Sequence, residues 1–154
     1  MSLTIGYATA TAQNAEQPDR GIDGVWRLTF TPHNCLTGTP IPTAVFEALF
    51  TFHKDGTMSV WSHNNVITLT RSPSHGLWRR GQGWNEYSTK FINLHYNLAT
   101  GAYQGRQEAK GSFALSASGN DLTSTNSTTV FDANGNAFAF GCSTSIGTRF
   151  ELEP

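Results

Sequence analysis

The chain has little charge and no long apolar run. Only 14% of its 154 residues are Asp, Glu, Lys or Arg, and the formal net charge is −1. Nucleic acids and anionic membrane surfaces are bound by an excess of basic residues, which this composition does not provide. No apolar stretch approaches the about 20 residues of a transmembrane helix. We therefore expect neither a nucleic-acid partner nor a membrane span.

Motifs for metal binding and for covalent catalysis are also missing. The histidines fall into no metal-binding spacing such as H-x-H or H-E-x-x-H; they are His33, His53, His63, His75 and His95. The chain has no G-x-S-x-G element and no glycine loop of the kind that holds phosphate groups. We expect no metal and no cofactor.

Helical periodicity is absent too, because apolar residues never recur at helical spacing beyond one turn. Gly, Thr, Ser and aromatic residues are abundant instead, with 10 Phe and 4 Trp. Turn signals such as Asp55-Gly56 separate runs of β-branched and aromatic residues, a pattern typical of antiparallel hairpins. The expected strands cover residues 24–32, 44–53, 57–62, 66–71, 77–80, 86–96, 103–116, 122–131 and 137–150.

Strands that follow one another through tight turns form a meander, and closing that sheet removes its two free edges. We predict an all-β fold over residues 21–154, an eight-stranded antiparallel up-and-down barrel, with nine strands as the alternative count. Eight strands enclose space for side chains or for one small ligand. Residues 1–20 carry no strand or helix pattern, so we expect a disordered N-terminus there, with the remnant of a secretory signal peptide as the alternative.

Cys35 and Cys142 are the only cysteines. Cys35 follows the first expected strand and Cys142 lies inside the last, and these two strands become neighbours when the barrel closes. A disulfide would then lock the seam, and it would indicate a secreted or periplasmic protein. Two buried free thiols are the alternative.

Gly24-Val25-Trp26 opens the first expected strand, and Arg149 lies on the last one. This combination resembles the calycins, the lipocalin-like closed barrels. The resemblance implies that the Trp26 indole closes one end of the barrel and that the Arg149 guanidinium lies across it, an attraction worth about 1–2 kcal/mol when partly dry. It also implies a hydrophobic ligand inside. A T-D-Y-like element before the seventh strand, which a typical lipocalin would have, is missing.

Alternation along the strands places bulky aromatic side chains on one face of the first three strands, but small or mildly polar ones over 103–116 and 122–131. Such a wall leaves room for a ligand, unless the bulky side chains reach across and fill the space. The expected ligand-binding residues are Trp61, Trp78, Trp84, Tyr87, Phe91, Tyr103 and Gln107.

Three functions fit these expectations. The first is a secreted or periplasmic lipocalin-like barrel that binds a small, largely apolar molecule. The second is a small-barrel cyclase or isomerase, similar to allene oxide cyclase, that works by confining its substrate. His75 and Arg79 are its catalytic candidates because they lie in an unusual basic and aromatic stretch, and Tyr103 and Gln107 are further candidates. The third is a solid barrel that binds or inhibits a protein through residues 72–76. The sequence leaves the ligand and the oligomeric state open.

Overall fold

The computed structural model describes residues 20–62 and 69–152. The prediction of a disordered N-terminus over residues 1–20 therefore falls, except for Arg20, outside the described residues and stays a prediction. The first residues of the strand expected at 66–71 also lie outside them.

Nine strands and one short 3-10 turn make up the described part of the chain. They are β1 (Gly24–His33), η1 (Pro42–Ala44), β2 (Phe46–Phe52), β3 (Thr57–Ser62), β4 (Leu69–Arg71), β5 (Ser74–Arg80), β6 (Glu86–Asn97), β7 (Tyr103–Leu115), β8 (Asp121–Asp132) and β9 (Ala137–Arg149). Every strand pair is antiparallel, and each barrel strand is hydrogen-bonded to its neighbours in the sequence.

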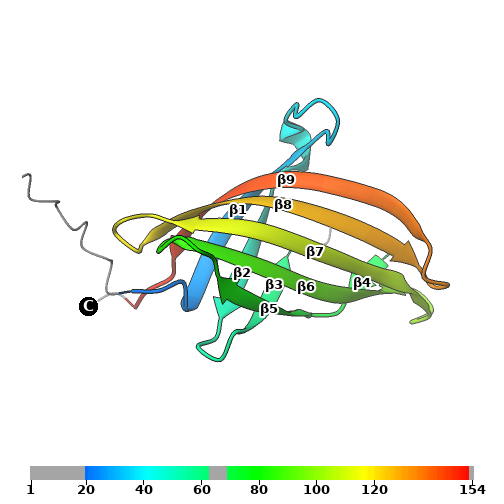
Figure 1. The fold of residues 1–154 in the computed structure, drawn as a ribbon. Helices are drawn as coiled ribbons and strands as arrows, with labels where there is room; N and C mark the ends of the chain where they lie inside the picture. Colours follow the sequence, from blue (N-terminus) through cyan, green and yellow to red (C-terminus); the bar gives the residue numbers. More distant parts are fainter. Residues whose placement is uncertain (1–19, 63–68, 153–154) are drawn as a thin grey trace, which may run out of the picture.

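The sheet closes on itself, because β1 pairs with β9 along a register that runs from Trp26 opposite Arg149 to His33 opposite Cys142. β6 pairs with β7, so the ring of eight strands has no break. Figure 1 shows the long strands β6 to β9 forming one wall and the shorter β1, β2, β3 and β5 forming the other. The predicted all-β, eight-stranded up-and-down barrel is confirmed, and β4 is one extra strand.

β4 and β5 lie on the same edge of β6, and a bulge separates them. Arg71 is opposite His95, while His75 is opposite Ile92, so the register slips by one residue between the two pairs. Ser72 bridges the slip: its N–H donates to the Leu94 carbonyl at 2.9 Å, and its Oγ accepts from the Leu94 N–H at 3.0 Å. Pro73, which has no N–H to donate, occupies the break. The expected interruption over residues 72–76 is therefore too long, since β5 already begins at Ser74.

One end of the barrel is filled by aromatic and aliphatic side chains. Trp26 is fully buried there, and its indole N–H donates to the Ile22 carbonyl at 2.8 Å. The surrounding core side chains come from six strands and include Leu28, Phe50, Phe52, Met58, Tyr87, Phe113, Leu115 and Leu122. This end is a packed core.

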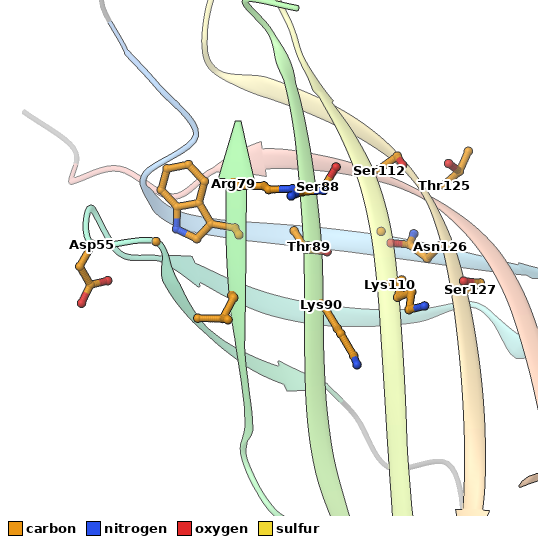
Figure 2. Close-up of a pocket in the computed structure, with 14 residues that line it drawn as sticks. Asp55, Arg79, Ser88, Thr89, Lys90, Lys110, Ser112, Thr125, Asn126 and Ser127 are labelled. Atoms are coloured by element: carbon orange, nitrogen blue, oxygen red, sulfur yellow. The ribbon is translucent and has the colours of Figure 1, made fainter. Parts of the chain in front are cut away.

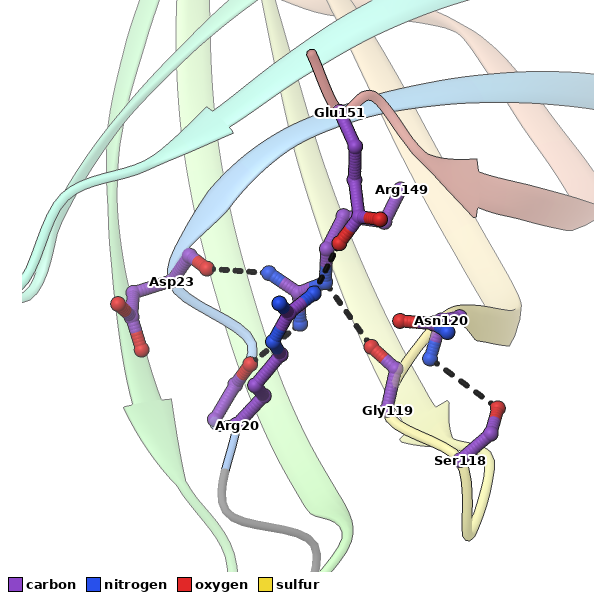
Figure 3. Close-up of polar contacts among 8 residues, drawn as sticks. Arg20, Asp23, Ser118, Gly119, Asn120, Arg149 and Glu151 are labelled. Carbon is purple, nitrogen blue, oxygen red and sulfur yellow. Dashed lines mark hydrogen bonds and ion pairs between the residues drawn. The ribbon is translucent and has the colours of Figure 1, made fainter. Parts of the chain in front are cut away.

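Arg149 closes the same end from outside (Figure 3). Its guanidinium carbon lies 4.4 Å from the centre of the Trp26 ring. The guanidinium also donates to three backbone carbonyls, those of Gly119 at 2.9 Å and of Asp23 and Gly21 at 2.6 Å each. The side chain thus joins the segment before β1 to the β7–β8 turn as well as to the indole.

The other end of the β1–β9 seam carries the disulfide. Cys35 and Cys142 are bonded, with their Cα atoms 5.3 Å apart. Cys142 is opposite His33, seven residues beyond the Arg149 end of the same strand pair. The seam at which the chain closes is therefore fastened at both ends.

Candidate functional site

The inward-facing side chains are aromatic and aliphatic at one end of the barrel and mostly polar toward the other. Beyond the aromatic core, the inward-facing positions of β6, β7 and β8 hold polar residues, among them Asn93, His95, Gln107 and Asn126. Asn93 and His95 are buried, with 3% and 6% of their surface exposed. A buried polar residue needs a partner, so this polar half is the first place to look for a function.

The strand register places the polar residues side by side. Arg71 on β4 is directly opposite His95 on β6, and Asn93 is directly opposite Gln107 on β7. Directly opposed residues on one face have Cβ atoms about 4.5–5.5 Å apart, close enough for both to contact the same ligand. Gly105, opposite His95, contributes no side chain, and a Cβ there would lie only 2.0 Å from the Phe131 carbonyl oxygen.

A small cavity of about 50 Å³ lies in this half of the barrel. Aromatic side chains form one part of its lining: Phe30, Phe46, Phe50 and Phe91. Polar side chains form the other part, including Arg71, Asn93, Gln107, Asn126 and Thr128. Since a water molecule takes up about 30 Å³ in the liquid, the cavity itself has room for one or two waters.

A second hollow adjoins the cavity at Arg71. This cleft of about 280 Å³ lies between the end of β3 and the β4–β5 bulge, and it shares Val60, Ser62 and Arg71 with the cavity lining. In the described part of the chain β3 pairs with β5 as far as Val60 opposite Ser74, and it does not pair with β4 beyond that point. Together the cleft and the cavity reach the lower end of the range of about 300–1,000 Å³ that small-molecule sites occupy.

Several buried polar atoms, three of them in this half, have no hydrogen-bond partner within the described part of the chain. They are Thr89 Oγ1, Asn93 Oδ1, His95 Nε2 and Gln107 Oε1. The Asn93 amide nitrogen does have a partner, because it donates to Ser74 Oγ at 3.2 Å. An unsatisfied buried polar atom costs about 1–3 kcal/mol, so four of them on two neighbouring strands call for an explanation.

Burial lowers the pKa of both basic side chains at this site, His95 and Arg71. Burial lowers the pKa of His95, the positive charge of Arg71 lowers it further, and a weak hydrogen-bonding interaction with the Gln107 side chain opposes these effects in part. Burial also lowers the pKa of Arg71. His95 is therefore held in its neutral form next to a fixed positive charge.

A wider hollow lies on the outer face of the barrel, across β5 to β8 (Figure 2). It is an open groove of about 830 Å³ whose lining includes Arg79, Lys90, Lys110, Ser112 and Thr125. Lys90 is paired with Glu108 at 3.3 Å. These side chains reach bulk water, which satisfies their hydrogen bonds, so the groove shows no requirement for a particular ligand.

The predicted ligand-binding residues are scattered. Phe91 and Gln107 line the cavity. Tyr87 and Trp78 instead belong to the packed end, where their rings lie 5.8 Å apart. The remaining three are largely exposed, Trp61 at 61%, Tyr103 at 42% and Trp84 at 39%. The ligand-binding role of each of the seven stays a prediction; Phe91 and Gln107 line the cavity, and Trp61 lines the adjoining cleft.

The catalytic candidates His75 and Arg79 lie on the outer face of β5, where both are exposed. His75 belongs to the strand rather than to a loop, and neither residue lines the interior cavity. Their catalytic role stays a prediction that this placement does not support. Within residues 20–62 and 69–152, no three His, Cys, Asp or Glu side chains gather to hold a metal ion.

Tyr103 was expected to face the interior, because strict alternation along the strand puts it on the same face as Gly105 and Gln107. A bulge overturns that assignment: His95 is opposite Gly105, but the next residue, Tyr96, is opposite Tyr103. Tyr103 is thereby turned to the outer face, where its ring lies 6.0 Å from that of Tyr96.

Sequence reasoning missed Arg71, Asn93 and His95. Period-two alternation along 86–96 puts Asn93 and His95 on the face of Tyr87 and Phe91, so the pattern could have found them. Arg71 carried no such signal, because its face depends on the register of β4 against β6.

Comparison of the sequence with known proteins does not identify a family. No family model matches the chain, and no curated protein is significantly similar to it in sequence. The calycin resemblance therefore extends only to the closed eight-stranded antiparallel barrel. Among the described residues no helix is long and apolar enough to cross a membrane.

Proposed function

We propose that the protein is a lipocalin-like barrel that binds a small, largely apolar molecule in the polar half of its interior. The observation that carries the proposal is a cavity with an aromatic wall whose lining includes two unpartnered amide oxygens, those of Asn93 and Gln107. Aromatic walls with a few convergent polar groups are typical of small-molecule sites. A bound ligand, or water held with it, would supply the missing hydrogen bonds.

The size of the cavity limits what can bind. About 50 Å³ is too small for a drug-sized molecule, so the ligand must also occupy the adjoining cleft at Ser62 and Arg71. An elongated molecule fits this shape, with one end among the phenylalanines and the other between β3 and the β4–β5 bulge.

The proposed location is secreted or periplasmic. The Cys35–Cys142 disulfide supports it, since disulfides persist in oxidising compartments and are rare in the cytosol.

Titration calorimetry with octanol and octanoate, together with native mass spectrometry of the protein purified from its own host, tests the proposal. Ala109 lines the cavity and is buried, whereas Ala114 lies exposed on the outer face of the same strand. We expect Ala109→Leu to fill the cavity and weaken binding, and the matched control Ala114→Leu to bind as the wild type does. The proposal fails if neither probe binds and no small molecule co-purifies, or if Ala109→Leu leaves the affinity unchanged.

A further inference from the structure

We propose, building on the function above, that the ligand is an apolar carboxylic acid whose carboxylate is held by Arg71. Its hydrocarbon part would then lie against the phenylalanines of the cavity. The proposal rests on the position of one cation, on the lack of an acidic partner for it among the described residues, and on the chemistry of the atoms around it.

Arg71 brings a positive charge to the lining of an otherwise neutral cavity. It lies where the cavity meets the cleft, and it is opposite His95. The ion pairs among the described residues all use other bases: they are Arg20–Glu151, Lys90–Glu108 and Arg106–Glu108. Residues 63–68, which link β3 to β4 and lie outside the described part, contain no Asp or Glu.

Arg71 is partly buried. A cation that is partly withdrawn from water without a counter-charge is costly, and a ligand carboxylate is the partner that removes this cost. The guanidinium presents two parallel N–H groups that match the two oxygens of a carboxylate, a geometry that a hydroxyl or amine ligand cannot reproduce. The neutral state of His95 agrees with this arrangement, because it leaves Arg71 as the one charged side chain in the cavity lining within the described residues.

The neighbouring amides fix which part of the site receives the anion. The unpartnered atoms of Asn93 and Gln107 are both amide oxygens, which accept hydrogen bonds and repel a carboxylate. The carboxylate therefore belongs at Arg71, on the cleft side, and the amide oxygens receive water or a donor on the ligand. The aromatic side is continuous, with the Phe30 and Phe46 rings stacked 5.1 Å apart and Phe91 at right angles to Phe50.

Three probes with one hydrocarbon chain and different end groups test the proposal on the full chain: octanoate, octanol and octylamine. In wild-type protein we expect octanoate to bind about ten- to hundredfold more tightly than octanol, the range that a charge-assisted hydrogen-bond pair provides, and octylamine to bind most weakly. We expect Arg71→Met to abolish this preference and Arg71→Lys to keep part of it. Arg79→Met is the matched control, because Arg79 lies on the outer face of the adjoining strand.

The outcomes separate this proposal from the one on which it rests. If wild-type protein binds octanol as tightly as octanoate, or if Arg71→Met keeps the preference, the carboxylate assignment is wrong while interior binding stands. If Arg79→Met alone removes binding, the anion site is on the outer face. If no probe binds at all, the proposed function fails and this inference fails with it. The comparison of end groups in wild-type protein decides the question even where Arg71→Met does not fold.

Discussion

Removing the Cys35–Cys142 disulfide should lower the stability of the barrel substantially without changing its shape. The crosslink spans 107 residues, for which loop entropy gives about 5 kcal/mol at 25 °C. Native disulfides commonly provide less, about 2–4 kcal/mol, against a total domain stability of about 5–15 kcal/mol. We therefore expect the double variant Cys35→Ala/Cys142→Ala to fold and to lose about 2–4 kcal/mol.

The folded state should survive because the seam has other interactions. β1 and β9 pair over eight residues, and Arg149 holds the opposite end through three backbone carbonyls. Urea unfolding followed by tryptophan fluorescence measures the effect. With a slope of about 2 kcal/mol per molar urea, the midpoint should fall by about 1–2 M.

Reductant provides the control for this experiment. It should shift the midpoint of the wild-type protein toward that of the double variant and leave the double variant unchanged. Equal midpoints for the oxidised wild type and the double variant would refute the entropic reasoning. Loss of the folded state in the double variant would show that β1–β9 pairing does not hold the seam alone.

Two further predictions concern the two halves of the interior. Trp26→Ala should cost about 3–5 kcal/mol in thermal unfolding, as a fully buried aromatic does, whereas Trp61→Ala, on the exposed face of β3, should change little. Burial holds the pKa of His95 below that of the unfolded chain, so the unfolded state gains a proton first and stability should fall as the pH drops below about 6.5. The decrease in the free energy of unfolding from pH 8 to pH 4 should be smaller in His95→Gln than in the wild type, and should stay the same in His75→Gln. An unchanged decrease in His95→Gln would contradict the assignment.

The closed barrel could be predicted from the sequence because its signals are local. Asp55-Gly56 gives the β2–β3 hairpin, in which Asp55 Oδ1 accepts from the Thr57 backbone N–H at 2.9 Å. Strand ends came within a few residues of the observed ones wherever glycine, asparagine or aspartate marked the turn. The first and last strands had to meet once the meander closed, which placed Trp26 beside Arg149 and Cys35 near Cys142.

Register irregularities account for what the sequence could not provide. A bulge leaves the composition of a strand unchanged but exchanges its two faces. The bulge between the pairs His95–Gly105 and Tyr96–Tyr103 has one local mark, Gly105, whose φ is +134°. The slip at Ser72 has the same effect on the short β4, whose inward residue, Arg71, is identified only by its pairing with β6. The candidate site lies where these two irregularities meet, so the sequence pattern was least informative at the place that matters most.

In β6, hydrophobicity alone would have assigned the wrong residues to the interior near the cavity, even with the alternation of the strand known. Near the cavity its inward residues are Asn93 and His95, whereas Ile92 faces outward and is 39% exposed. A strand selected only for packing would carry the opposite arrangement, because apolar side chains gain and polar ones lose by burial. The packed end of the same strand obeys the rule, with Tyr87 inward and buried. Proteins break such rules mainly at functional positions. The inversion at Ile92, Asn93 and His95 lies in the half of the barrel where we place the ligand, which agrees with that placement.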